Sequence, residues 1–101
     1  MADKPVRVFV VEDQLLVRRG IVELLEPEEE VEVVGEAQDG VEALRQIPRL
    51  RPDVALVDAR MPRMDGIELI RRLSDEHPRV AAIVLTTFDD GYVFGGLGAG
   101  A

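Results

Sequence analysis

Short apolar runs alternate with amphipathic segments along this chain. Four runs are rich in valine, alanine, leucine and isoleucine and have the length of strands: residues 6–11, 31–37, 53–58 and 80–87. Most of their positions are apolar, which is typical of strands covered on both faces, as in a parallel sheet. We therefore predict four largely buried strands.

Three segments between these runs have the spacing of helices with one apolar side. In two of them an acidic residue stands three positions before a glutamate, Asp39 before Glu42 and Asp65 before Glu68, which is the spacing of an acidic capping box. A helix over residues 14–25 precedes them, with Arg18 on its polar side. The residues expected to face inward are Val17, Ile21, Leu24 and Leu25 on the first helix, Ala43, Leu44, Ile47 and Leu50 on the second, and Ile67, Ile70 and Leu73 on the third.

The order of these elements predicts the fold class. Strands and helices that alternate with short connections form an α/β fold, a doubly wound parallel sheet with right-handed crossovers and helices on both faces. The 101 residues fit a single small domain. Pro48 removes a backbone donor late in the second helix and predicts a kink or an early end there. After Thr87 the pattern gives way to glycine, and we expect residues 95–101 to be frayed or disordered.

Composition narrows the possible functions. The formal net charge of −8 disfavours binding to nucleic acid phosphates by this chain alone. Cysteine is absent and His77 is the only histidine, which excludes thiolate sites and sites with several histidines. His77 is best explained as a charge near the end of the third helix. No apolar run approaches a membrane span and the start lacks a secretory signal, so we expect a cytoplasmic protein with no membrane partner.

Acidic residues stand where the predicted strands end. Glu12 and Asp13 follow the first strand, Asp58 ends the third, and Thr86 lies at the end of the fourth. Ligands of open α/β sheets bind at this edge, and three carboxylates there would repel one another unless a cation were present. Oxygen ligands of this kind suit Mg²⁺. Each residue also has a purely structural explanation, namely helix or loop capping for the acids and strand propensity for the threonine.

Several motifs together resemble a known family. The segments VVEDQLLVRRG, EAQDGVEAL, DVALVDARMPRMDGIELI and IVLTTFDD are similar, in order and spacing, to the receiver domain of bacterial two-component response regulators. The resemblance covers residues 5 to about 94 and is closest to the subfamily often joined to a LuxR-type helix-turn-helix. It implies a flavodoxin-like (CheY-like) sheet with strand order 2-1-3-4. The family also has a fifth strand with a lysine and a fifth helix, and since this sequence has neither, we expect residues 1–101 to form a receiver domain that is incomplete at its C-terminus.

The resemblance also implies roles for individual residues. Asp58 would be the phosphoacceptor, taking a phosphoryl group from a phosphohistidine of a sensor histidine kinase. Asp13 would bind Mg²⁺ directly and Glu12 through a water molecule, while Arg60 would contribute its backbone carbonyl. Thr86 would be the switch residue that hydrogen-bonds the phosphoryl group.

The predicted function is that of a phosphoaccepting signalling domain in control of a transcription regulator. Such a domain assists its own phosphoryl transfer and dephosphorylation but is not otherwise an enzyme, and it would meet DNA only through a domain not present in this chain. The apolar strand 80–87 would be an unprotected edge, which favours a homodimer or edge-strand self-association. One alternative is a pseudo-receiver, an interaction module that is not phosphorylated. Another is a phosphatase of the haloacid dehalogenase type, which is disfavoured because Arg60 stands where that family needs an acidic residue.

Overall fold

Four parallel strands alternate with three helices in the computed structural model, which describes residues 4–59 and 66–85. The strands are β1 (Val6–Val11), β2 (Val31–Ala37), β3 (Val54–Asp58) and β4 (Ala81–Leu85), and the helices are α1 (Leu15–Leu25), α2 (Gly40–Leu50) and α3 (Gly66–Glu76). All neighbouring strands pair in parallel, and the order in the sheet is β2-β1-β3-β4. The predicted fold class and the strand order 2-1-3-4 are therefore confirmed.

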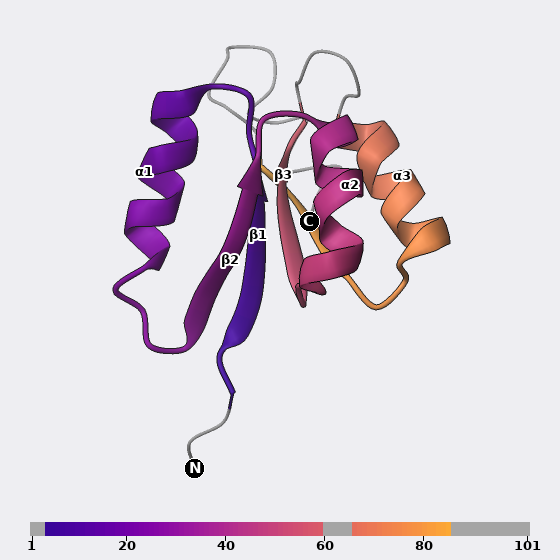
Figure 1. Cartoon of the computed structure of the whole chain (residues 1–101). Helices are drawn as coiled ribbons and strands as arrows, with labels where there is room; N and C mark the ends of the chain where they lie inside the picture. Colours follow the sequence, from indigo (N-terminus) through magenta and orange to yellow (C-terminus); the bar gives the residue numbers. More distant parts are fainter. Residues whose placement is uncertain (1–3, 60–65, 86–101) are drawn as a thin grey trace.

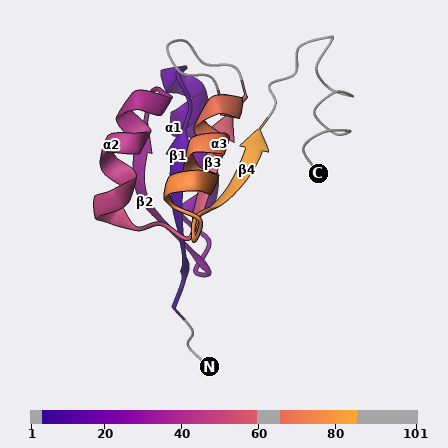
Figure 2. The same cartoon turned by 90° about the vertical axis from the view of Figure 1, so that its right-hand side faces the viewer.

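The helices form a layer on each face of the sheet (Figures 1 and 2). On one face, α1 packs its buried Val22 against Val8 and Val10 of β1. On the other face, α2 and α3 cover a larger cluster that includes Phe9 of β1 and Val57 of β3. β1 and β3 contribute to both clusters because successive residues of a strand point to opposite faces. This explains why both strands are almost entirely apolar.

The second helix follows the sequence prediction closely. Ala43 and Ile47 are buried, and the other two expected residues, Leu44 and Leu50, pack against the same core. The Asp39 side chain accepts a hydrogen bond of 2.8 Å from the backbone N–H of Glu42, and the Glu42 carboxylate in turn accepts one of 3.2 Å from the N–H of Gln38. The helix passes through Pro48 and ends two residues later, so the proline does not end it at once.

On the other two helices the predicted inward-facing residues were confirmed in part. The residues that pack against the core as predicted are Ile21 and Leu25 on α1, and Ile70 and Leu73 on α3. On α1 the fully buried residue is Val22, whereas Leu24 is 76% exposed. On α3 the buried residues are Leu69 and Leu73, whereas Ile67 is 58% exposed. The predictions for Leu24 and Ile67 were wrong because both helices carry more apolar residues than one face can bury, and contact with the sheet selects among them. Val17, expected inside, is also exposed.

Gly35 allows the sheet and α2 to approach closely. A Cβ atom built there would lie 2.7 Å from Leu50 Cδ1 and 2.8 Å from Phe9 Cε1, closer than a real side chain tolerates. The pairing of β1 with β2 shifts register next to it, between Val8 and Phe9. The missing side chain thus leaves room for the phenylalanine ring in the core.

Some predictions fall outside the described residues. They concern the cap at Asp65, the carbonyl of Arg60, the switch residue Thr86 and the state of residues 95–101. Among the helices of the described residues, none is both long enough and apolar enough to cross a membrane.

Candidate functional site

Three carboxylates meet at the carboxyl edge of the sheet. Glu12 and Asp13 directly follow β1, and Asp58 is the last residue of the neighbouring strand β3. Each can offer an oxygen that lies within 4.8 Å of those of the other two. The residues Glu12 and Asp58 are 1% and 2% exposed, while Asp13 is half-buried. The fold thus brings together the three acids that the sequence placed at strand ends, and we name them the acidic trio.

The chain around Glu12 is held on three sides. Its backbone N–H donates to the carbonyl of Ala37 on β2 at 3.0 Å. Its carboxylate accepts a hydrogen bond of 2.9 Å from the N–H of Gln14, the residue just before α1. Its backbone carbonyl accepts a hydrogen bond of 2.8 Å from the Arg18 guanidinium. Glu12, the first residue of the acidic trio, is therefore anchored to β2 and to α1.

The pKa of Glu12 is raised from 4.5 to about 7, chiefly by burial and, to a lesser extent, by the negative charge and hydrogen bonding of Asp58 and by hydrogen bonding with Asp13. The hydrogen bond from Gln14 acts in the opposite direction, because it stabilises the ionised form. In the absence of a cation, the acidic trio therefore favours a proton on Glu12. A divalent cation can replace that proton and relieve the repulsion, and three carboxylate oxygens match the ligand preference of Mg²⁺.

Gly66 brings the start of α3 close to Asp58. A Cβ atom at this buried glycine would collide with the backbone oxygen of Asp58 and lie 2.8 Å from the Cα atom of Ala59. The Gly66 N–H donates to the Ala59 carbonyl at 3.3 Å. Only a residue without a side chain fits there, so α3 can pack directly on the backbone that carries Asp58.

The end of β4 lies beside the acidic trio. Leu85 pairs with Asp58 in the sheet, and its carbonyl accepts a hydrogen bond of 3.1 Å from the N–H of Ala59. Leu85 is the last described residue of this strand and directly precedes Thr86 in the sequence. The roles of Thr86 and of the Arg60 carbonyl remain predictions, because both residues lie outside the described part of the chain.

Arg18 supports the site from the side of α1 that faces the sheet, so the prediction that it lies on the polar side of the helix was wrong. Its side chain is only 15% exposed, and it bridges the Glu12 carbonyl and the Glu36 carboxylate of β2. The signal was present in the spacing, because Arg18 stands four residues before the buried Val22 and therefore on the same side of α1. The sequence alone did not reveal that this side faces the sheet.

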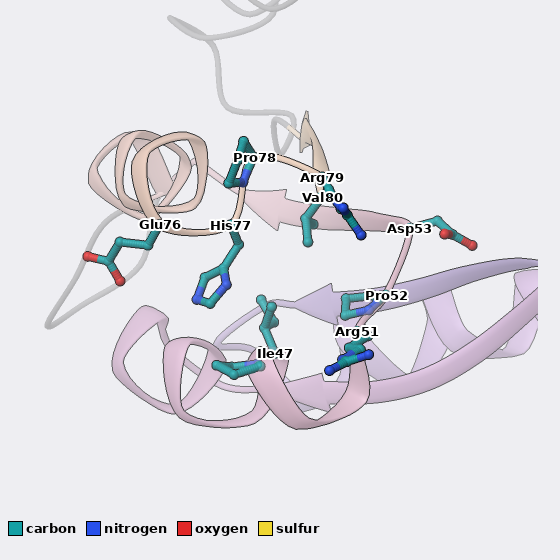
Figure 3. A pocket seen from close by; sticks show the side chains of 10 residues that line it. Ile47, Arg51, Pro52, Asp53, Glu76, His77, Pro78, Arg79 and Val80 are labelled. Atoms are coloured by element: carbon teal, nitrogen blue, oxygen red, sulfur yellow. The ribbon is translucent and has the colours of Figure 1, made fainter.

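A pocket at the opposite edge of the sheet is not part of this site. It lies between the ends of α2 and α3 and the starts of β3 and β4, with Ile47 and His77 in its wall (Figure 3). Its two carboxylates already have donors: Asp53 accepts from the backbone N–H of Arg7, and Glu76 accepts from Arg72. In a parallel sheet the amino and carboxyl edges lie at opposite ends, so the pocket is remote from the acidic trio. His77 does follow the last residue of α3, as expected.

The chain is similar to known proteins over most of its length. The family model described as the response regulator receiver domain matches residues 8–101. The DNA-binding transcriptional activator DevR/DosR of Mycobacterium tuberculosis is 46% identical over 83 residues, which are 82% of this chain and 38% of that protein. The chain thus spans well under half of this relative.

Solved structures agree with the sequence matches. The signal receiver domain of the response regulator NarL from Mycobacterium tuberculosis has a TM-score of 0.81 and 37% identity, covering 98% of this chain and 81% of that one. The isolated receiver domain of RcsB from Salmonella enterica serovar Typhimurium, solved in the presence of phosphomimetic BeF₃⁻, has a TM-score of 0.80 and 31% identity, covering 93% and 70%. From its fold, its acidic trio and these matches, the chain belongs to the response regulator receiver domain family.

Proposed function

We propose that this domain receives a phosphoryl group on Asp58 from a phosphohistidine of a sensor histidine kinase. The observation that carries the proposal is the acidic trio, in which Asp58 ends β3 within reach of Glu12 and Asp13. The receiver fold makes phosphorelay signalling the natural context. The RcsB receiver domain was solved in the presence of phosphomimetic BeF₃⁻, which is consistent with phosphorylation of that relative.

In the proposed transfer, a carboxylate oxygen of Asp58 attacks the phosphorus atom. A P–O bond forms, the P–N bond to the histidine breaks, and the histidine leaves as a neutral ring when its second nitrogen carries a proton. The product is an acyl phosphate. The approach of an anionic carboxylate to an anionic phosphoryl group is opposed by charge, so the reaction depends on positioning and on neutralisation of that charge.

Mg²⁺ is the cofactor that fits these residues, and it would supply the neutralising charge next to the phosphoryl oxygens. The proposal is supported by the oxygens of the acidic trio, which lie within 4.8 Å of one another, and by the burial and the neighbouring charge that raise the pKa of Glu12. Asp13 and Asp58 would bind the ion directly and Glu12 through water, with the Arg60 carbonyl as a further ligand. Thr86 would hydrogen-bond the phosphoryl group.

The output of the domain is proposed to be regulation of transcription. DevR/DosR is named as a DNA-binding transcriptional activator, and this chain spans 38% of its length. The net charge of −8 argues that the receiver domain itself does not contact DNA. DNA contact would then require a separate domain, and phosphorylation of Asp58 would act on it at a distance.

The test is the intact mass of the protein after incubation with acetyl phosphate and Mg²⁺. We expect the addition of one phosphoryl group with loss of acetate from the donor, and no addition to Asp58→Asn or in the presence of a chelator. Asp53→Asn is a matched control, because this exposed aspartate lies at the opposite edge of the sheet. Uptake that persists in Asp58→Asn would contradict the assignment, and a wild-type chain that is never modified would favour the pseudo-receiver alternative.

A further inference from the structure

We propose that Arg18 is a positioning residue that holds the turn with Glu12 and Asp13 in the geometry needed to bind a divalent cation. The inference rests on the proposed function, since it assigns a further residue to the same site. Its basis is one half-buried guanidinium that joins three elements. Nη1 of Arg18 donates to the Glu12 carbonyl at 2.8 Å, and Nε donates to the Glu36 carboxylate at 2.9 Å.

The hydrogen bond from Arg18 to the Glu12 carbonyl takes the place of a sheet hydrogen bond just beyond the last paired residue of β1. The pairings of β1 with β2 and with β3 both have Val11 as their last residue. Beyond it, the Glu12 N–H still reaches the Ala37 carbonyl, but the Glu12 carbonyl accepts its hydrogen bond from Arg18. A buried backbone carbonyl requires a donor, so the guanidinium determines where this peptide group lies.

Glu36 holds the guanidinium in place. It lies on β2, next to Ala37, and its second oxygen accepts a longer bond of 3.3 Å from Arg19. The Arg18 side chain is 15% exposed and that of Arg19 is 52% exposed. Arg18 is thus enclosed between α1, β2 and the end of β1, whereas Arg19 contacts the same carboxylate from the surface.

Arg18 bonds the backbone of Glu12 and not the carboxylates of the acidic trio. Among the described residues its side chain has two acceptors, the Glu12 carbonyl and Glu36, and neither is a side chain of the trio. Two donors of one planar group reach one acceptor just after β1 and another on β2, which the single ammonium group of lysine does not reproduce. Groups that hold metal ligands in place typically contribute about 10-fold to 100-fold to metal affinity.

The test compares Arg18→Gln with Arg19→Gln. Both variants remove one positive charge beside Glu36, but only Arg18 contacts the backbone of Glu12. We expect Arg18→Gln to weaken Mg²⁺ binding by about tenfold or more, measured by calorimetric titration, and Arg19→Gln to change it little. The Mg²⁺ concentration for half-maximal phosphoryl uptake should rise by the same factor. Arg18→Lys, which keeps the charge, should restore stability better than affinity.

Two further measurements separate positioning from a purely structural role. Urea unfolding without metal reports stability alone, and a variant that loses stability but binds Mg²⁺ normally would overturn the proposal. The amide shift of Gln14 reports the Glu12 carboxylate without any metal, because this N–H donates to it. We expect the shift to change in Arg18→Gln and Arg18→Lys but not in Arg19→Gln.

The outcomes distinguish this inference from the proposed function. A wild-type chain that neither binds Mg²⁺ nor takes up phosphoryl groups would refute the proposed function, while the Gln14 shift would still show whether Arg18 positions the turn. In the other case the wild-type chain binds Mg²⁺ and takes up a phosphoryl group. Equal Mg²⁺ affinity of Arg18→Gln and Arg19→Gln would then overturn the role of Arg18 and leave the proposed function intact. If Arg18→Gln does not fold, the same comparison is made with Arg18→Lys.

Discussion

Without a divalent cation, the stability of this domain should fall as the pH rises from 4.5 to about 7, because Glu12 is buried beside two other carboxylates. The pKa of Glu12 is raised in the folded state, so the folded chain binds the proton more tightly than the unfolded chain does. Below pH 4.5 the Glu12 carboxyl is protonated in both states, and it does not lower the free energy of unfolding. Above pH 7 the carboxyl is ionised in both states, and the full loss of stability from burying its charge is present.

The size of the effect follows from the two pKa values. The difference between 4.5 and about 7 corresponds to about 3 kcal/mol, at about 1.4 kcal/mol for each tenfold change in proton affinity. Small domains have free energies of unfolding of about 5–15 kcal/mol, so this loss would be a large share of the total. Mg²⁺ binds the ionised trio, and it should therefore reduce the loss at neutral pH.

Urea denaturation between pH 4.5 and 8, in chelator and in excess Mg²⁺, measures this effect. Glu12→Gln is the decisive variant, because an amide keeps an oxygen for the Gln14 N–H and cannot ionise. Titrating groups outside the acidic trio contribute equally to both proteins, so the difference between wild type and variant reports Glu12 together with its interaction with Asp58 and Asp13. We expect that difference to change by about 3 kcal/mol across the range in chelator and by less in Mg²⁺. A difference that does not change with pH, or that favours wild type as the pH rises, would refute the reasoning.

Three other predictions concern the metal, the packing beside Asp58 and the edge of the sheet. Mg²⁺ at ten times its Kd should stabilise the wild type by about 1.4 kcal/mol, and thermal melts should show little rise for Asp13→Asn; an equal rise would place the ion elsewhere. Gly66→Ala should cost roughly 1–3 kcal/mol and slow phosphoryl uptake, because its Cβ meets the Asp58 backbone. Gly20→Ala, where a Cβ meets nothing within 4 Å, should instead stabilise α1 by up to about 1 kcal/mol, and urea unfolding compares the two. Ile83 is 48% exposed on β4, whose outer edge pairs with no strand in the described part of the chain, so the 101-residue chain should self-associate and Ile83→Lys should reduce this. Sedimentation that shows a monomer at all concentrations would contradict this last prediction.

The sequence was sufficient for the elements, the order of the fold and the position of the acidic trio. Apolar runs of strand length that alternate with amphipathic segments indicate a parallel sheet, and the short connections leave few topologies. The resemblance to receiver domains supplied the strand order that the structure confirms. Carboxylates at the ends of adjacent parallel strands must share one edge, so this strand order is enough to group Glu12, Asp13 and Asp58. The capping pair Asp39 and Glu42 was equally local and was also confirmed.

Only the tertiary structure decided which apolar residues of α1 and α3 are buried and which contacts hold the acidic trio in place. The apolar residues of α1 extend around much of its circumference, so periodicity did not distinguish Val22, which is buried, from Leu24, which is exposed. The raised pKa of Glu12 and the two bonds of Arg18 depend on groups from separate elements. A pattern along the chain records the polarity of each residue but not its neighbours in space. The secondary structure elements and their order were therefore predictable from the sequence. The burial of single side chains, their pKa values and the contacts between elements depend on the tertiary structure.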